Sequence, residues 1–178
     1  MNLRSATSAD VPALALLGRE SFVAAFGHLY SEANLQTFLE MAYSDEAVRG
    51  EVEGGECIHQ LADDGTRLLG FVKLRYPSWY VDDSPTCLRS PIALGQLYTQ
   101  PDLTGQGIGA ALMDWSIAEA RARGHDAIQL SVWAENFGGQ RFYERYGFAK
   151  VAAIDFWVGD HRDDEFLYEL RLQPGGCE

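Results

Sequence analysis

The sequence predicts a mixed α/β (α+β) fold, built on a mostly antiparallel central sheet flanked by helices. Three observations support this fold class. Helical stretches follow one short extended segment near the start, a β-hairpin occupies the middle, and a strand–helix–strand–helix order precedes a closing hairpin. The 178 residues, 47% of them hydrophobic, are enough for one domain with a sizeable core.

Apolar segments between turn residues mark the predicted strands. In chain order they are residues 1–6, a hairpin of 57–63 and 67–76 around Asp64-Gly65, residues 92–99, residues 127–133, and a closing hairpin of "AKVAAIDFWVG" and "EFLYELRL" joined by the turn "DHRDD". Residues 77–91 hold three prolines and are predicted to form a long loop.

Capping residues and glycines mark the ends of five predicted helices. In chain order they run from Thr7 or Ser8 to Gly27, from Ser31 through "EANLQTFLEMAY", from Ser44 to Gly54-Gly55, from about Gly107 to Arg123 before Gly124, and through "NFGGQRFYERYGF" to Gly147. Helical spacing predicts that the fourth helix packs through Ile108, Leu112, Trp115 and Ala118 or Ala122.

No repeat or linker divides the sequence, so residues 1–174 are predicted to form a single domain, with a short tail at 175–178. The sequence has no apolar run near the ~20 residues that a membrane helix needs. Acidic residues and a proline come too early for a secretory signal. We therefore expect a cytoplasmic protein that does not act at a membrane. The edge strand of the closing hairpin is a candidate surface for a homodimer.

The net charge of the chain limits the classes of ligand that it is expected to bind. Lys plus Arg is 14 and Asp plus Glu is 26, a formal net charge of −12. This balance argues against nucleic acid, which needs a basic surface, and is compatible with steering a cationic amine. The widely spaced Cys57, Cys87 and Cys177 suggest reduced thiols. The four histidines show no ligand spacing, so we expect no metal.

The stretch "LYTQPDLTGQGIGAAL" (97–112) brings a strand, a glycine-rich corner and a helix start together. That order is typical of a site for a phosphate-bearing ligand. No Lys and Ser/Thr follow the glycines as a P-loop requires. A dinucleotide fingerprint is formally met by Gly105, Gly107 and Ala110, but too little sequence follows for a doubly wound sheet. A simple strand-to-helix turn and the pyrophosphate loop of an acyl-CoA-binding protein remain open.

Two blocks of the sequence resemble the GNAT superfamily of N-acetyltransferases. The superfamily motif Arg/Gln-x-x-Gly-x-Gly/Ala falls on residues 104–109, and Asn-x-x-Ala-x-x-Phe-Tyr-x-x-x-Gly-Phe falls on residues 136–148. Thr104 replaces the usual Arg/Gln, and Gly139 replaces the usual Ala. The likeness covers nearly the whole chain. "SFVAAFGHLYSEANLQTFLE" and "VGDHRDDEFLYEL" are similar to the bacterial spermidine/spermine N-acetyltransferase branch.

This resemblance implies a GNAT fold with splayed central strands, and acetyl-CoA as co-substrate. The residues implied to bind acetyl-CoA are Leu97, Tyr98 and Thr99 along the pantetheine arm, Thr104, Gly105, Gln106, Gly107, Ile108, Gly109 and Ala110 around the pyrophosphate, and Asn136 at the pantetheine end. Asn136 is equally suited to capping the following helix.

The resemblance also implies that Tyr143 is the general acid. A phenol, with a pKa near ~10, can donate a proton to the thiolate that leaves when an amine attacks a thioester. Many family members carry a glutamate base on the strand before the glycines, but "PIALGQLYT" has no carboxylate. The base is therefore open: the candidate residues are Glu32, Asp82, Asp83, Glu135 and His28, and the alternatives are water or a loss of the chemistry.

Aromatic and acidic residues gather in three connections, and aromatic faces with carboxylates suit an amine or polycation. The candidate acceptor residues are Tyr30, Glu32, Trp79, Asp82, Asp83, Trp157, Asp160 and Asp164. The expected function is transfer of an acetyl group from acetyl-CoA to a primary amine, such as a polyamine, by direct attack in a ternary complex. The alternatives are acetylation of a protein N-terminus or an antibiotic amine, and a non-catalytic acyl-CoA-binding regulator.

Overall fold

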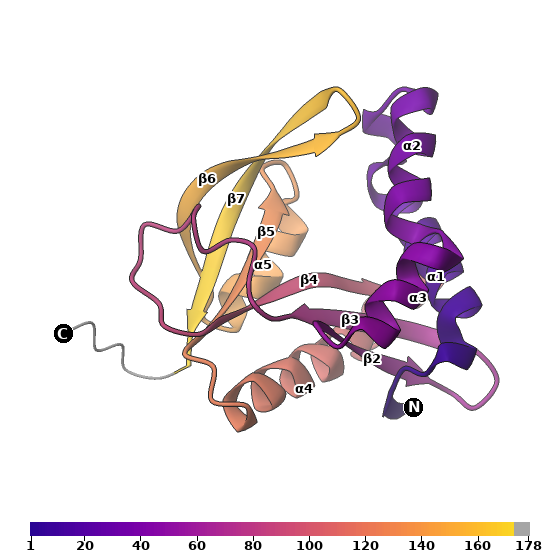
Figure 1. The fold of residues 1–178 in the computed structure, drawn as a ribbon, viewed down its shortest axis with the longest axis horizontal. Coiled ribbons are helices and arrows are strands. Elements are labelled where there is room, and N and C mark those ends of the chain that lie inside the picture. Colours follow the sequence, from indigo (N-terminus) through magenta and orange to yellow (C-terminus); the bar gives the residue numbers. More distant parts are fainter. Residues whose placement is uncertain (173–178) are drawn as a thin grey trace.

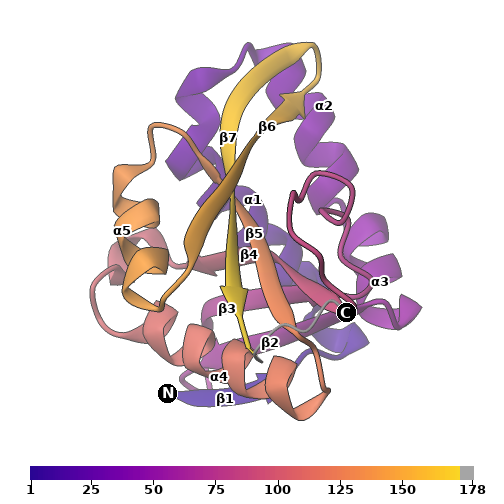
Figure 2. The same ribbon diagram turned by 90° about the vertical axis from the view of Figure 1, so that its left-hand side faces the viewer.

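The structure, a computed structural model, describes residues 1–172, which share one seven-stranded sheet (Figures 1 and 2). The strands are β1 (Asn2–Ser5), β2 (Cys57–Asp63), β3 (Leu68–Arg75), β4 (Pro91–Thr99), β5 (Ala127–Trp133), β6 (Ala149–Val158) and β7 (His161–Arg171). Their order in the sheet is β1-β2-β3-β4-β5-β7-β6. The β4–β5 pair is parallel and each other neighbouring pair is antiparallel, which confirms the predicted fold class.

Within residues 1–172, five helices flank the sheet in the predicted order. They are α1 (Val11–Phe26), α2 (Glu32–Tyr43), α3 (Asp45–Gly54), α4 (Ile108–Ala122) and α5 (Phe137–Arg145). Short 3-10 turns at Ser8–Asp10, Gly27–Leu29 and Pro101–Leu103 precede or follow them. Two predicted caps are confirmed: the Ser31 hydroxyl accepts a hydrogen bond from the Asn34 amide, and Ser44 does the same for Ala47. The predicted cap of the first helix was wrong, because Thr7 precedes the 3-10 turn and Asp10 is the N-cap of α1.

Two hydrophobic layers cover opposite faces of the sheet because side chains alternate along each strand. Phe71 of β3 packs with Leu14 and Leu17 of α1, whereas its neighbour Val72 packs with Leu112 of α4. Figure 1 shows α4 on one side of the sheet and α1 to α3 gathered on the other.

The predicted core face of α4 was partly wrong. Its buried residues are Ile108, Leu112, Met113, Ser116 and Ala120, while Trp115 is partly buried and Ala118 and Ala122 are exposed. The hydroxyl of Ser116 donates a 2.7 Å hydrogen bond to the Leu112 carbonyl. This bond satisfies the polar group inside the helix and lets the small serine lie on the buried face.

The closing hairpin also differs from its prediction. The strand β7 begins at His161, so the turn spans Gly159 and Asp160 alone, and Val158 pairs directly with His161. Gly159 has a φ of +61°, a conformation that favours glycine in a tight turn. Residues 161–164, expected in the loop, therefore alternate along a strand.

The cysteines correct a further expectation. Cys57 is a free thiol, but Cys87 is disulfide-bonded, so the prediction of three reduced thiols was wrong. Cys177 and the predicted tail at 175–178 lie outside the described residues. Within residues 1–172, every helix is too short or too polar to cross a membrane.

The central strands separate in the middle of the sheet. β4 pairs with β5 over Pro91–Ala93 and Ala127–Gln129. On its other side β4 carries a bulge at Gly95, since Lys73 lies opposite Gln96 and Leu74 lies opposite Leu94. Beyond Ala93 the two strands diverge, with β5 continuing along β7. This divergence confirms the expected splay.

Candidate active site

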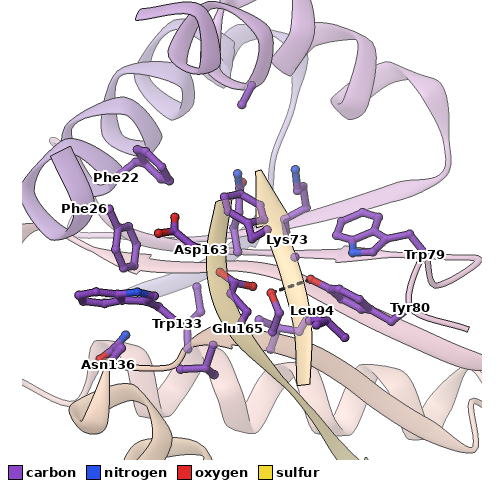
Figure 3. Close-up of a pocket in the computed structure, with 18 of the residues that line it drawn as sticks. Phe22, Phe26, Lys73, Trp79, Tyr80, Leu94, Trp133, Asn136, Asp163 and Glu165 are labelled. Atoms are coloured by element: carbon purple, nitrogen blue, oxygen red, sulfur yellow. Dashed lines mark hydrogen bonds between the residues drawn. The ribbon is translucent and has the colours of Figure 1, made fainter. Parts of the chain in front are cut away.

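A cavity of about 530 Å³ occupies the space where β4 and β5 separate. Its walls come from strands β3 to β7, from α1 and α2, from the loop at 77–91 and from the start and middle of α5 (Figure 3). Aromatic side chains of Phe22, Phe26 and Trp133 approach from one side and Trp79 and Tyr80 from the other. The lining therefore combines aromatic side chains with polar and acidic groups.

The glycine turn lies between the end of β4 and the start of α4. Gly105 and Gly107 have φ values of +79° and +82°, so both positions strongly favour glycine. Gly107 caps α4, which begins at Ile108, and residues 104–107 are exposed. The first amides of a helix have no partner within it, and with the helix dipole they suit an anion such as a diphosphate.

The end of β4 supplies a backbone edge beside the cavity. Leu97 and Tyr98 line the cavity, and Thr99 pairs with Gly70 of β3 on the opposite edge. Because β5 has turned away from this part of β4, the edge can pair with an extended amide-containing chain such as pantetheine. The glycine turn and this edge together fit coenzyme A.

Asn136 lines the cavity and also caps α5. Its Oδ1 accepts a 2.9 Å hydrogen bond from the Gly139 amide. A Cβ atom built at Gly139 would lie 2.7 Å from Asn136 Nδ2. The replacement of the usual alanine by Gly139 therefore has a physical reason: it leaves room for this orientation of Asn136.

Tyr143 lies on α5 and faces the cavity. Its ring packs against Phe142 and Phe148, with centroids 5.3 and 5.8 Å away, whereas Phe142 also packs against Tyr146. None of the hydrogen bonds within residues 1–172 uses the Tyr143 hydroxyl. Burial raises the pKa of Tyr143 above its usual value, so the hydroxyl keeps its proton at neutral pH.

Two carboxylates of β7 face the cavity. Asp163 is 6% exposed and accepts a 2.5 Å hydrogen bond from the Tyr30 hydroxyl. Two positions along the strand, Glu165 presents its carboxylate to the same space (Figure 3). The Oε2 atom of Glu165 is buried without a hydrogen-bond partner among the described residues.

The environment of Glu165 changes its acidity. Burial raises the pKa of Glu165 to about 7, against a smaller lowering by the neighbouring Ser131 hydroxyl, while the nearby Asp163 charge raises it further. Glu169, on the same face of β7, differs because Ser84, Thr86 and Gln129 all donate hydrogen bonds to it. One buried carboxylate is thus fully bonded, and the other retains an unused oxygen beside the cavity.

The predicted acceptor residues divide into two groups. Tyr30, Trp79 and Asp83 line the cavity. Glu32, Asp82, Trp157, Asp160 and Asp164 lie outside its lining, as do the candidate bases His28 and Glu135. Asp164 pairs with Arg162 at 3.0 Å, and Asp160 accepts a hydrogen bond from the Asn34 side chain. These bonds give Asp160 and Asp164 partners outside the cavity.

The sequence interpretation missed Glu165, Asp163, Ser131 and Tyr80. A signal for the two carboxylates was present: Asp163, Glu165, Leu167 and Glu169 share one face if the strand begins before residue 163. Assigning "DHRDD" to the turn removed Asp163 from this alternation. Ser131 similarly shares a face of β5 with Gln129 and Trp133.

The divergent sheet, the glycine turn at a helix start and the adjacent cavity define the class of acyl-CoA-dependent acyltransferases. The model of the acetyltransferase (GNAT) family matches residues 19–148, and the chain belongs to this family. It is therefore an N-acetyltransferase that uses acetyl-CoA, as the resemblance implied.

Individual relatives are distant. The chain is 26% identical over 166 residues to an uncharacterised N-acetyltransferase of Lactobacillus delbrueckii subsp. lactis, covering 92% of each chain. It is 23% identical over 179 residues to the spermidine N(1)-acetyltransferase of Thermoplasma acidophilum, covering 97% of this chain and 98% of that one. The crystal structure of the PaiA N-acetyltransferase of Thermoplasma acidophilum with coenzyme A has a similar fold: the TM-score is 0.75 at 22% identity, covering 96% and 98% of the chains.

Proposed function

We propose that this protein transfers the acetyl group of acetyl-CoA to a primary amine of a small cationic acceptor of the polyamine type. One observation carries the proposal: the hydroxyl-bearing Tyr143 and the carboxylate of Glu165 line the same cavity where the central strands separate. The first suits a general acid and the second a general base.

Glu165 is the proposed base. With a pKa of about 7 it is partly ionised at neutral pH, and a base whose pKa lies near the working pH is effective in proton transfer. Its Oε2 atom lacks a partner among the described residues, so it can accept a proton from an ammonium group directly or through one water. A base on β7 is compatible with the absence of a carboxylate on β4.

Tyr143 is the proposed acid. Once Glu165 has taken a proton from the ammonium group, the neutral nitrogen attacks the thioester carbonyl. The C–N bond forms, the C–S bond breaks, and Tyr143 donates its proton to the leaving thiolate. The second amine proton restores the phenol, so the products are an amide, a CoA thiol and the proton on Glu165.

Acetyl-CoA is proposed to lie along the residues expected from the sequence. The turn Gln106–Ala110 would hold the pyrophosphate, the Leu97–Thr99 edge would pair with the pantetheine arm, and Asn136 would contact its thiol end. Bound there, acetyl-CoA supplies the activated acetyl group.

The lining of the cavity supports a cationic acceptor. Asp83, Asp155, Asp163 and Glu165 contribute acidic groups. Lys73 also lines the cavity but is paired with Glu51 at 2.7 Å, just as Asp155 is paired with Arg162 at 2.9 Å. The aromatic side chains of Phe22, Phe26, Tyr30, Trp79 and Trp133 add faces that attract a cation. The net charge of −12 favours such a ligand over a nucleic acid. The name of the Thermoplasma spermidine relative supports a polyamine.

The test is release of the CoA thiol from acetyl-CoA over a panel of amines. The panel contains spermidine, spermine, putrescine, a simple alkylamine and peptides with free N-termini. We expect turnover of the polyamines, with Tyr143→Phe and Glu165→Gln each lowering kcat about a hundredfold. Asp164→Asn, which removes a carboxylate on the outer face of β7, is the control and should leave kcat unchanged. Turnover of peptides alone would refute the acceptor class, and coenzyme A binding without turnover would refute the enzymatic function.

A further inference from the structure

The loop at 77–91 brings Trp79, Tyr80 and Asp83 into the cavity wall. At its start, the Ser78 hydroxyl donates a 2.6 Å hydrogen bond to Gln129 Oε1 and accepts one from the Tyr80 amide. Ser78 is 6% exposed and Gln129 is fully buried. The first turn of the loop is thus fixed to β5 by bonds shielded from water.

A second anchor holds the middle of the loop. The hydroxyls of Ser84 and Thr86 donate hydrogen bonds to Glu169 of β7, which also accepts a 2.9 Å bond from Gln129 Nε2. Glu169 is 4% exposed. Gln129 therefore joins both anchors, and the loop is held against β5 and β7 rather than free in solution.

Trp79 packs over the bulge of β4. A Cβ built at Gly95 would lie 2.7 Å from Trp79 Cη2, so the glycine is what allows the indole to approach this closely. Ser78 is fixed on β5 and Trp79 is fixed on β4. Because these two residues directly precede Tyr80, they restrict the direction in which Tyr80 points. Its hydroxyl donates a 3.0 Å hydrogen bond to Ser131 Oγ (Figure 3).

We propose that Tyr80 is a positioning residue that holds the Ser131 hydroxyl so that its proton is donated to the carboxylate of Glu165. A serine hydroxyl has one proton to donate and two lone pairs to accept with. Tyr80 uses a lone pair, which leaves the Ser131 proton free to be donated. Ser131 lies on the same face of the sheet as Glu165, two positions along β5 from Trp133, which is the direct partner of Glu165, and both side chains line the cavity. The inference rests on the proposed base role of Glu165, but the hydrogen-bonded chain itself can be tested without turnover.

The hydrogen bonds from Tyr80 to Ser131 and from Ser131 to Glu165 have a defined effect on proton transfer. A hydrogen bond to the ionised carboxylate favours that form and lowers the pKa of Glu165 against the raising effect of burial. Without the Tyr80 hydroxyl, Ser131 can rotate and its bond to Glu165 weakens. The carboxylate then ionises at higher pH, and the base is present in a smaller fraction at pH 7.

Other titratable groups near Glu165 also influence its pKa. The titratable groups that face it are Asp163 on β7, Tyr30 after α1, Tyr98 on β4 and Tyr80 itself, and Lys73, Asp83, Tyr143 and Asp155 also line the cavity. Burial raises the pKa of Tyr30, Tyr80 and Tyr98, so the three phenols are neutral near pH 7. Asp163 is the close acidic neighbour, and Tyr80→Phe leaves it in place.

The direct test follows the Glu165 carboxyl by carbon-13 NMR in protein labelled at the glutamate side-chain carboxyls, with Glu165→Gln assigning the signal. We expect a titration midpoint near pH 7 in the wild type, raised by about 0.5–1 unit in Tyr80→Phe and by at least as much in Ser131→Ala. Tyr76→Phe, which removes a hydroxyl from an exposed tyrosine outside the cavity, should not move it. An unmoved midpoint in both Tyr80→Phe and Ser131→Ala would overturn the proposal.

Kinetics separates this proposal from the proposed function. With spermidine, Tyr80→Phe should lower kcat/KM about two- to fivefold at pH 7, recover toward the wild-type value at pH 9, and leave the KM for acetyl-CoA unchanged. In a Glu165→Gln background the same change should have no further effect. Full activity of Glu165→Gln would refute the base role, even if the NMR midpoint moves. A loss of activity in Glu165→Gln with an unmoved midpoint in Tyr80→Phe would refute the positioning role alone.

Discussion

The Tyr30 hydroxyl donates a 2.5 Å hydrogen bond to Asp163 Oδ2 across 133 residues of sequence, and this bond joins the segment after α1 to β7. Tyr30 also stacks on Phe22, with ring centroids 6.0 Å apart and planes 7° from parallel. His161 Nε2 lies 3.2 Å from Asp163 Oδ1 on the other side. Asp163, which lines the cavity, is therefore held between the Tyr30 hydroxyl and the His161 imidazole.

Tyr30→Phe should weaken both the fold and acceptor binding. A hydrogen bond to a buried charged group contributes about 1.5–3 kcal/mol, so we expect a loss of about 1.5 kcal/mol or more in the free energy of unfolding, measured with urea. The KM for the amine should rise severalfold while the KM for acetyl-CoA stays constant. Equal changes in both KM values would contradict a role at the acceptor end.

Gly139→Ala tests the fit between Gly139 and Asn136. Alanine favours a helix over glycine by about 1 kcal/mol, but its Cβ would displace the Asn136 side chain that caps α5 and contributes a similar amount. We expect little net change in the free energy of unfolding and a several-fold higher KM for acetyl-CoA.

Gly138→Ala is the matched control for that change. A Cβ there would lie 3.8 Å from Asn136 Oδ1, an ordinary contact. This variant should be stabilised by up to about 1 kcal/mol with its KM for acetyl-CoA unchanged. If the two alanine variants had the same free energy of unfolding and the same KM for acetyl-CoA, the orientation of the Asn136 side chain would not depend on Gly139.

Glu169→Gln should destabilise the protein and loosen the loop at 77–91. The change replaces an acceptor of three hydrogen bonds by an amide whose NH₂ group faces donors, at an expected cost of about 2–3 kcal/mol in the free energy of unfolding. Hydrogen exchange should increase in the loop before it does so in β2 or β3. Glu119→Gln breaks an exposed helix pair with Arg123 and should cost less than 1 kcal/mol. A similar loss of unfolding free energy in Glu169→Gln and Glu119→Gln would argue against Glu169 as an anchor of the loop.

Much of the fold could be predicted from the sequence because local signals agreed with the final packing. Ser31 and Ser44 cap helices as their positions suggested, and the glycines at 105 and 107 adopt the positive φ values that a tight strand-to-helix turn needs. Such features depend on the chain within a few residues.

The candidate site was harder to predict because it depends on register and on distant pairings. Shortening the final turn to Gly159 and Asp160 extends β7, and this extension places Asp163 on the face of the strand that carries Glu165. The bonds from Tyr80 to Ser131 and from Ser84 to Glu169 join residues 51 and 85 positions apart. No local pattern encodes these contacts. Tyr80 and Ser84 both lie in the irregular loop at 77–91, whose course cannot be predicted from residue spacing.

The most direct test of the central claim is the pH dependence of kcat/KM for spermidine in the wild type and in Glu165→Gln. The pKa of Glu165 is raised to about 7, and a base acts only when ionised, so wild-type kcat/KM should rise as the pH increases through about 7. In Glu165→Gln this rise should disappear and the residual rate should follow only the ionisation of the amine at higher pH. A rise with the same midpoint in both proteins would show that another group is the base.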